Sequence, residues 1–180
     1  MNSPLGRLKD CDPPTYQDRL ADLIRTIRPN IVVETGLCLG FGAEYILRAL
    51  DDCGKGHLYS IDPMDFNHLS NGCIPRPDEY DANPIIHPRF TLIRKLSQDA
   101  LEPLFDEVGP FDVFIHDSDH SAECQSFEYE AAWRMVRPGG IIVSDDIAWG
   151  NPPHQTWDKF LAWHNLKATI IGNAQFAVHP

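Results

Sequence analysis

The chain has 180 residues, of which 43% are apolar and 23% are charged. This is the length and composition of one globular domain, so we expect a single domain over residues 1–180 with no disordered tail. Its 26 acidic and 15 basic residues give a net charge of -11, and this negative field excludes nucleic acid as an expected partner.

No apolar run approaches the roughly 20 residues of a membrane span, and the first ten residues lack the apolar core of a secretory signal. We therefore expect no membrane partner and a cytoplasmic location. The five cysteines are odd in number and widely scattered, which is typical of reduced thiols rather than a disulfide framework.

Strand and helix periods alternate along the chain. The expected elements are, in chain order, a helix over 15–28, a strand over 31–34, a helix around 43–50, strands over 57–61 and 90–93, a helix over 98–105, a strand over 111–115, a helix over 122–136, a turn at 138–140, a strand over 141–144, a helix around 157–164, and strands over 168–171 and 175–178. This order predicts an α/β fold, a Rossmann-like doubly wound and mostly parallel seven-stranded sheet with a C-terminal antiparallel β-hairpin.

The proline-rich stretch over 63–88 has little periodicity and is long for a structureless loop. We expect either a substrate flap or an ordinary surface excursion there. In a doubly wound sheet, ligands bind beyond the carboxyl ends of the strands, so the residues that follow each strand are the ones to inspect.

The first strand runs into a glycine-rich loop over 34–42, where glycines permit a tight turn and a close approach of the backbone to a ligand. Asp62 ends the second strand, where its carboxylate can accept hydrogen bonds from both hydroxyls of a ribose. Together these features indicate an adenosine-containing ligand, although each alone also fits a purely structural turn.

Carboxylates also cluster after the fourth and fifth strands. The ends of these strands are neighbours in a parallel sheet, so Asp117, Asp145 and Asp146 should converge, and their mutual repulsion requires a cation or protonation. Three oxygen ligands suit Mg²⁺, with Mn²⁺ as a possible substitute. The alternative is that Asp145 and Asp146 cap the following turn while Asp117 pairs with a basic residue.

Taken together, the motifs resemble those of the class I S-adenosylmethionine-dependent methyltransferases, and within them the metal-dependent O-methyltransferases of the catechol and sugar-modifying types. The resemblance spans about residues 15–150. Its five motifs are, in order, VVETGLCLGFG, YSIDP, RKLSQDAL, FDVFIHDSDHS and RPGGIIVSDDI.

The resemblance implies a cofactor, S-adenosylmethionine, and a small hydroxylated acceptor such as a sugar or a catechol, bound by a monomer or a homodimer. It also implies metal ligands at Asp117, Asp145 and Asp146, and a base at Asp119 or His120 that takes the proton of the acceptor hydroxyl, with Asp119 preferred. His116 is interpreted as structural. The implied cofactor-binding residues are Glu34, Gly36, Leu37, Gly40, Asp62, Ser97, Gln98 and Asp117.

Two other functions fit part of the same pattern. The segment over 35–42 also matches the TGxxxGxG loop of NAD(P)-binding short-chain dehydrogenases, but no tyrosine in the chain is followed four residues later by the lysine of their catalytic pair. A catalytically inactive nucleotide-binding module is the second alternative. The cost of keeping clustered buried acids without a use argues against it.

Overall fold

The computed structural model of the protein describes residues 16–38, 40–63, 85–147 and 153–180. Its helices are α1 (Tyr16–Ile27), α2 (Phe41–Cys53), α3 (Ser97–Val108), α4 (Ala122–Met135) and α5 (Pro153–Trp163). Its strands are β1 (Ile31–Thr35), β2 (His57–Ile61), β3 (Phe90–Ile93), β4 (Phe111–His116), β5 (Val136–Ser144), β6 (Ala168–Ile171) and β7 (Ala174–Val178).

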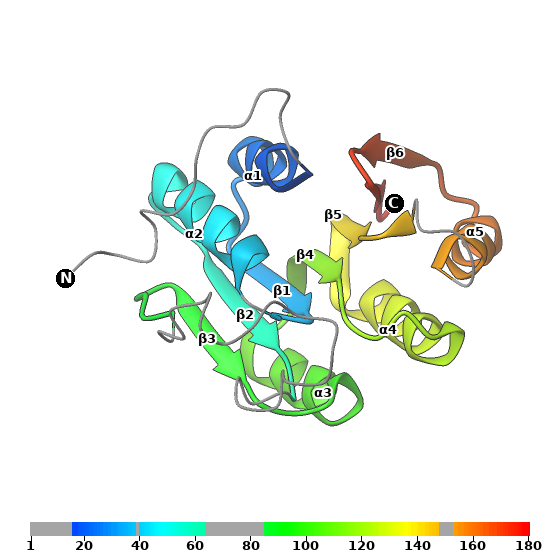
Figure 1. Cartoon of the computed structure of the whole chain (residues 1–180), viewed down its shortest axis with the longest axis horizontal. Coiled ribbons are helices and arrows are strands. Elements are labelled where there is room, and N and C mark those ends of the chain that lie inside the picture. The colour runs from blue at the N-terminus through cyan, green and yellow to red at the C-terminus, as the bar shows by residue number, and fades with distance from the viewer. Residues whose placement is uncertain (1–15, 39, 64–84, 148–152) are drawn as a thin grey trace, which may run out of the picture.

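The seven strands form one sheet in the order β3-β2-β1-β4-β5-β7-β6 (Figure 1). The first five are parallel, and β7 pairs antiparallel with both β5 and β6. Helices α1 and α2 cover one face of the sheet, while α3, α4 and α5 cover the other. The predicted doubly wound sheet with its C-terminal hairpin is confirmed.

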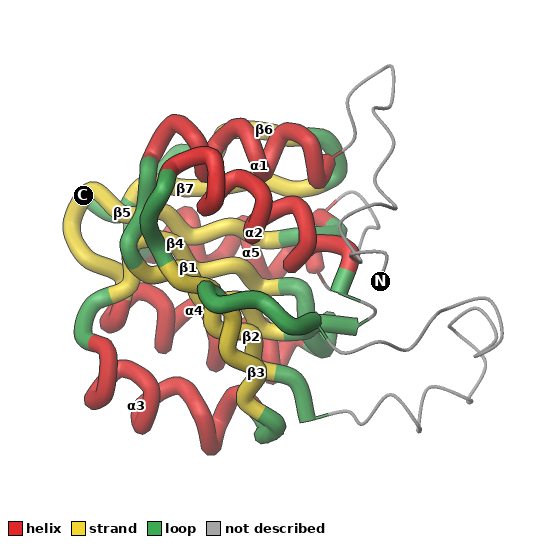
Figure 2. Tube along the Cα trace, turned by 90° about the vertical axis from the view of Figure 1, so that its left-hand side faces the viewer, coloured by secondary structure: helices red, strands yellow, loops and turns green. Residues whose placement is uncertain are grey.

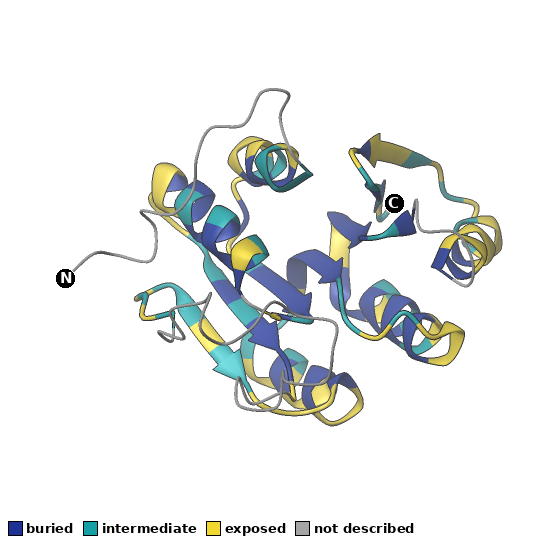
Figure 3. Cartoon of the chain, viewed as in Figure 1, coloured by how far each residue is buried: buried dark blue, intermediate teal, exposed yellow. Residues whose placement is uncertain are grey.

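The centre of the sheet is buried, as the dark β4 and the dark second half of β5 in Figure 3 show. All six residues of β4 are buried, and from Val113 to Ile115 successive side chains enter opposite cores, as the period of two in a strand requires. Val113 and Ile115 pack with α1 and α2, whereas Phe111 and Phe114 pack with α3, α4 and α5. This layered core fixes the edge at which the parallel strands end.

The predicted end of the long helix and the turn after it are wrong. The helix α4 ends at Met135, and the segment over 136–140 already belongs to β5. Val136 pairs with Phe111, and the register then shifts before the pairing of Val113 with Ile141. The glycines allow this irregularity, because a Cβ on Gly140 would lie 2.7 Å from the carbonyl oxygen of Asp112.

Helix α1 lies beside the edge strand β6, as both Figure 1 and Figure 2 show. Most of the predicted substrate flap, residues 64–84, lies outside the described residues. Among the helices that the structure describes, none combines the length and apolarity needed to cross a membrane.

Candidate functional site

The ends of β1, β2, β4 and β5 are tied together by backbone hydrogen bonds at the carboxyl edge of the sheet. The Gly36 amide donates to the Ile61 carbonyl at 2.9 Å, and the Asp117 amide donates to the Thr35 carbonyl at 3.0 Å. Gly36 has a φ of 86°, and a Cβ at this position would lie 1.9 Å from the Asp117 carbonyl oxygen. Only glycine fits where these two strand ends meet.

Asp62 shapes the glycine-rich loop. Its Oδ2 accepts hydrogen bonds from the backbone amides of Leu37, at 2.8 Å, and Cys38, at 3.0 Å. The carboxylate is buried, yet Asp62 is among the residues that line a cavity at this edge. The second-strand acid therefore contacts the loop of the first motif directly.

The cavity has a volume of about 370 Å³ and is bounded by the ends of β1, β2 and β4 and by the starts of α3 and α4. Five of the eight predicted cofactor-binding residues line it: Gly36, Asp62, Ser97, Gln98 and Asp117. The other three, Glu34, Leu37 and Gly40, are not among the described residues that line this cavity. The structure therefore brings residues from four of the five motifs to one cavity or its border.

Glu34 lies behind the glycine-rich loop. Its side chain is buried and accepts a short hydrogen bond from the Ser60 hydroxyl. Burial raises the pKa of Glu34 to about 7; it outweighs the hydrogen bond from Ser60, which lowers the pKa, and the charge of Asp62 adds a smaller increase. A carboxyl group at this position is costly to ionise in the protein alone.

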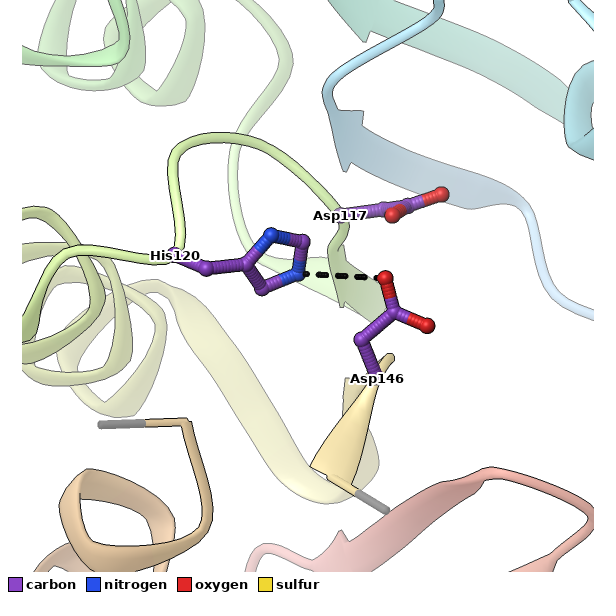
Figure 4. Close-up of side chains that lie close together, drawn as sticks. All are labelled: Asp117, His120 and Asp146. Atoms are coloured by element: carbon purple, nitrogen blue, oxygen red, sulfur yellow. Dashed lines mark ion pairs between the residues drawn. The ribbon is translucent and has the colours of Figure 1, made fainter. Parts of the chain in front are cut away.

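An acid cluster borders the cavity. Asp117, His120 and Asp146 each offer one potential ligand atom, and these atoms lie within 4.8 Å of one another (Figure 4). The His120 Nε2 atom is 3.7 Å from the Asp146 Oδ2 atom. Asp145, the third predicted metal ligand, is not part of this group, because its Oδ1 accepts from the Asp146 amide at 2.7 Å.

The carboxylates of this edge repel one another. Burial raises the pKa of Asp117 well above its usual value, and the charges of Asp145, Asp146 and Glu34 raise it further. Burial also raises the pKa of Asp145 to about 7, against the hydrogen bond from the Asp146 amide, and the charge of Asp146 adds a smaller increase. Every charge that shifts the pKa of Asp117 is another carboxylate, which is the condition that a bound cation relieves.

The two predicted bases differ in their surroundings. Asp119 is exposed, and its two oxygens accept from the amide and the hydroxyl of Ser121 at 3.0 and 2.9 Å. His120 is half-buried, and its ring faces Asp146 (Figure 4). Burial and the charge of His116 lower the pKa of His120, so its imidazole is neutral at pH 7.

A family model described as a methyltransferase domain matches residues 33–147, which carry the five motifs except for Val32, the first residue of the first motif. The chain belongs to this methyltransferase family. Membership decides between the two interpretations of the glycine-rich loop, in favour of the methyltransferase and against the dehydrogenase. Among curated proteins, none matches this methyltransferase chain.

Solved structures share the fold at low sequence identity. An O-methyltransferase from Bacillus cereus in complex with SAH is 20% identical, with a TM-score of 0.65 over 94% of this chain and 82% of that one. The O-methyltransferase TomG from Streptomyces achromogenes, involved in tomaymycin synthesis and in complex with SAM, is 21% identical, with a TM-score of 0.64 over 96% and 82%.

MycE, a methyltransferase of the mycinamycin biosynthetic pathway in complex with Mg, SAH and mycinamycin VI, is 20% identical, with a TM-score of 0.63. The match covers 88% of this chain but only 48% of MycE. These likenesses establish that the chain has the methyltransferase fold.

Sequence reasoning missed two residues of the methyltransferase site. Tyr16, at the start of α1, is partly buried, and its pKa is raised well above the usual value by burial and then by the charges of Asp145 and Asp117. It therefore stays a neutral phenol within the field of the acid cluster. A tyrosine at the start of an amphipathic helix carries no signal that could have distinguished it from a core residue.

The second missed residue is Glu128 of α4, which is fully buried and lines the cavity. His116 donates from Nδ1 to Glu128 Oε2 at 2.6 Å, in agreement with its predicted structural role. The ring of His116 also meets the ring of His120 edge-on, with centroids 5.5 Å apart. Glu128 therefore borders the cavity directly, and His116 links it to His120 of the acid cluster.

Proposed function

We propose that this methyltransferase transfers a methyl group from S-adenosylmethionine to a hydroxyl group of a small acceptor, a sugar or a catechol-like compound. One observation carries the proposal: Asp117 belongs both to the lining of the cavity and to the acid cluster. A cofactor in the cavity and an acceptor at the cluster would therefore both lie next to Asp117, so the two would be close together, as group transfer requires.

The residues of the cavity suit the cofactor. Gly36 allows close approach of the backbone, Asp62 supplies a carboxylate for the ribose, and Ser97 and Gln98 supply polar groups for the adenine. When bound, S-adenosylmethionine supplies a methyl group activated by its sulfonium charge. The negative edge formed by Glu34 and Asp117 favours that positive charge.

The carboxylates at this edge suit a divalent cation, and we assign Asp117, Asp145 and Asp146 as the residues that would hold Mg²⁺, or Mn²⁺ in its place. Such an ion supplies the positive charge that these repelling carboxylates lack, and it lowers the pKa of a nearby hydroxyl. The magnesium in the MycE complex supports this assignment. Asp145 would need to turn its side chain from the Asp146 amide to take part.

His120 suits the role of general base better than Asp119. Its imidazole is neutral and faces Asp146, whereas both oxygens of Asp119 already accept hydrogen bonds from Ser121. With the cofactor bound, the acceptor oxygen would bond to the methyl carbon as the carbon–sulfur bond breaks and a neutral thioether leaves. His120 would take the hydroxyl proton of the acceptor.

The test is methyl transfer from labelled S-adenosylmethionine to a panel of sugars and catechols, with Mg²⁺ or with EDTA. We expect transfer to at least one acceptor with Mg²⁺ and its loss in EDTA. The Asp146→Asn variant should be slower by about 1000-fold, since a metal ion contributes several kcal/mol of stabilisation.

Asp158→Asn on the outer face of α5 serves as the control and should keep the wild-type rate, because Asp158 is exposed. Transfer that is equally fast in EDTA or in the Asp146→Asn variant would contradict the metal assignment. Cofactor binding without transfer to any hydroxylated acceptor would instead favour an inactive binding module.

A further inference from the structure

Glu128 is a buried carboxylate whose contacts all come from residues around the cofactor cavity. Its Oε2 accepts from the Thr35 hydroxyl at 2.5 Å and from His116 Nδ1 at 2.6 Å. Its Oε1 accepts from the Ser118 hydroxyl at 2.8 Å and from the Cys124 thiol at 3.5 Å. These donors come from the ends of β1 and β4 and from α4, so one side chain joins three elements that border the cavity.

Glu128 is ionised and its acceptor capacity is filled. Burial opposes ionisation, but the hydrogen bond and charge of His116, with help from Thr35 and Ser97, outweigh it and lower the pKa of Glu128. A carboxylate offers about four lone-pair sites, and the donors Thr35, His116, Ser118 and Cys124 fill them, with Ser97 as a further donor. Glu128 therefore has no site left for a ligand, and it acts on the cavity through the groups that it holds.

The direction of the Ser118 hydrogen bond sets what this residue can offer to a ligand. A hydroxyl has one proton and two lone pairs, and the proton of Ser118 is directed to Glu128. Ser118 itself lines the cavity. Its hydroxyl oxygen is thus left to the ligand as an acceptor, which complements a ligand N–H and opposes a ligand carbonyl oxygen.

We propose that Glu128 is a positioning residue that fixes Ser118 as a hydrogen-bond acceptor, so that the cavity selects a ligand carrying an amino group over one carrying a carbonyl oxygen at that point. This inference rests on the proposed function, in which the ligand is S-adenosylmethionine. We assign this amino group to the 6-amino group of adenine, because Ser118 lines the same cavity as Ser97 and Gln98, the residues proposed to contact the adenine. The disfavoured analogue then carries hypoxanthine, which has an oxygen at the same position.

The experiment compares the affinities of SAH and S-inosylhomocysteine, its 6-oxo analogue, by calorimetry. The ratio of the two dissociation constants reports the selectivity separately from overall stability or affinity. We expect wild-type protein to prefer SAH by at least about tenfold, as is typical when a mismatched ligand leaves a polar group unpaired. In the Glu128→Gln variant the new amide can donate to Ser118, so the hydroxyl turns its proton to the cavity and the ratio should fall about tenfold.

Two further variants complete the design. Ser118→Ala removes the proposed acceptor and should also reduce the ratio, even if Glu128→Gln fails to fold. Asp112→Asn alters another buried carboxylate, at the opposite edge of the sheet, and should leave the ratio at the wild-type value.

A ratio in either Glu128→Gln or Ser118→Ala that stays within about twofold of the wild-type ratio would overturn the inference. A twofold change corresponds to less free energy than one hydrogen bond typically contributes. If the ratio in Asp112→Asn falls as far as in Glu128→Gln, the inference is also overturned, because the loss of any buried charge would then reduce the selectivity. If folded wild-type protein binds neither SAH nor S-adenosylmethionine, the proposed function itself fails.

Discussion

Strand β4 carries a buried carboxylate, Asp112, near its start and is followed by a partly buried one, Asp117, and the two groups behave in opposite ways. At the start, Asp112 accepts from the amides of Asn30 and Ile31 at 2.8 Å each and from the Arg137 guanidinium at 2.6 Å. Although burial opposes ionisation, these partners lower the pKa of Asp112. Beyond the end of the strand, burial and neighbouring carboxylates raise the pKa of Asp117.

The contrast shows that the two edges of the sheet meet different demands. At the amino edge the charge of Asp112 has its partners within the chain. The carboxyl edge concentrates acids that repel one another, which costs folding free energy unless a ligand compensates. The following predictions test this division, beginning with the largest expected effect.

Gly36→Ala should be the most damaging change at the carboxyl edge. The new Cβ would meet the Asp117 carbonyl oxygen at 1.9 Å, and the positive φ adds strain, so we expect a loss of at least about 3 kcal/mol in the free energy of unfolding. Urea denaturation measures it. Gly42→Ala on α2 is the matched control, since a Cβ there meets nothing within 4 Å, and it should stabilise the protein by about 0.5–1 kcal/mol. Equal effects at the two glycines would show that the edge is not closely packed.

Glu34→Gln should stabilise the metal-free and cofactor-free protein increasingly as the pH rises. A carboxyl whose pKa is raised to about 7 in the folded state holds its proton after the unfolded state has lost it, so its contribution to stability falls between about pH 4.5 and pH 7. The variant has no ionisable group at this position, so its stability does not fall in this way. Its free energy of unfolding should therefore rise relative to that of wild type by about 2–3 kcal/mol between pH 5 and pH 8.

The measurement is urea denaturation at several pH values, with Glu102→Gln on the exposed face of α3 as the control. The difference between the control and wild type should stay constant with pH. A Glu34→Gln difference that is equally flat would mean that Glu34 ionises in the folded protein as easily as in the unfolded chain.

Asp112→Asn should destabilise the protein without touching the site. Loss of the charge that holds Arg137 and two backbone amides should cost about 1–2 kcal/mol near pH 7. Because the pKa of Asp112 is lowered in the folded state, its contribution is fully present above the unfolded value of about 3.9 and is lost as the pH falls further. Thermal unfolding at pH 7 and pH 3 checks this, and SAH affinity should be unchanged. A weaker affinity for SAH would contradict the claim that the amino edge serves stability alone and the carboxyl edge binds the ligand.

The sequence was sufficient for those parts of the site that depend on topology. Parallel strand ends must share one edge, so Asp62, Asp117 and the pair Asp145 and Asp146 could be placed together from their positions after strands. The sequence did not distinguish the roles of the adjacent acids. Asp146 adopts a positive φ of 54°, which turns its side chain toward His120, while Asp145 accepts from its neighbour's amide. Such a local turn has no signature in composition or spacing.

Glu128 shows a second limit. The helical spacing of Cys124, Phe127, Ala131 and Met135 predicts that these four side chains form the buried face of α4. In the structure Phe127 is only partly buried, and Glu128 is fully buried. A glutamate in a helix is normally solvated, and the donors that compensate Glu128 lie on β1 and β4, far away in the sequence. The bulge at the start of β5 was missed for a similar reason, because the pairing of Val136 with Phe111 depends on tertiary contacts.

The most direct test of the central claim is a calorimetric titration of SAH into wild-type protein and into the Gly36→Ala and Asp112→Asn variants, with and without Mg²⁺. We expect one SAH to bind per wild-type chain, with similar affinity in Asp112→Asn and with no measurable binding in Gly36→Ala. A folded wild-type protein that binds no SAH under either condition would contradict the account, and so would SAH binding that Gly36→Ala leaves intact.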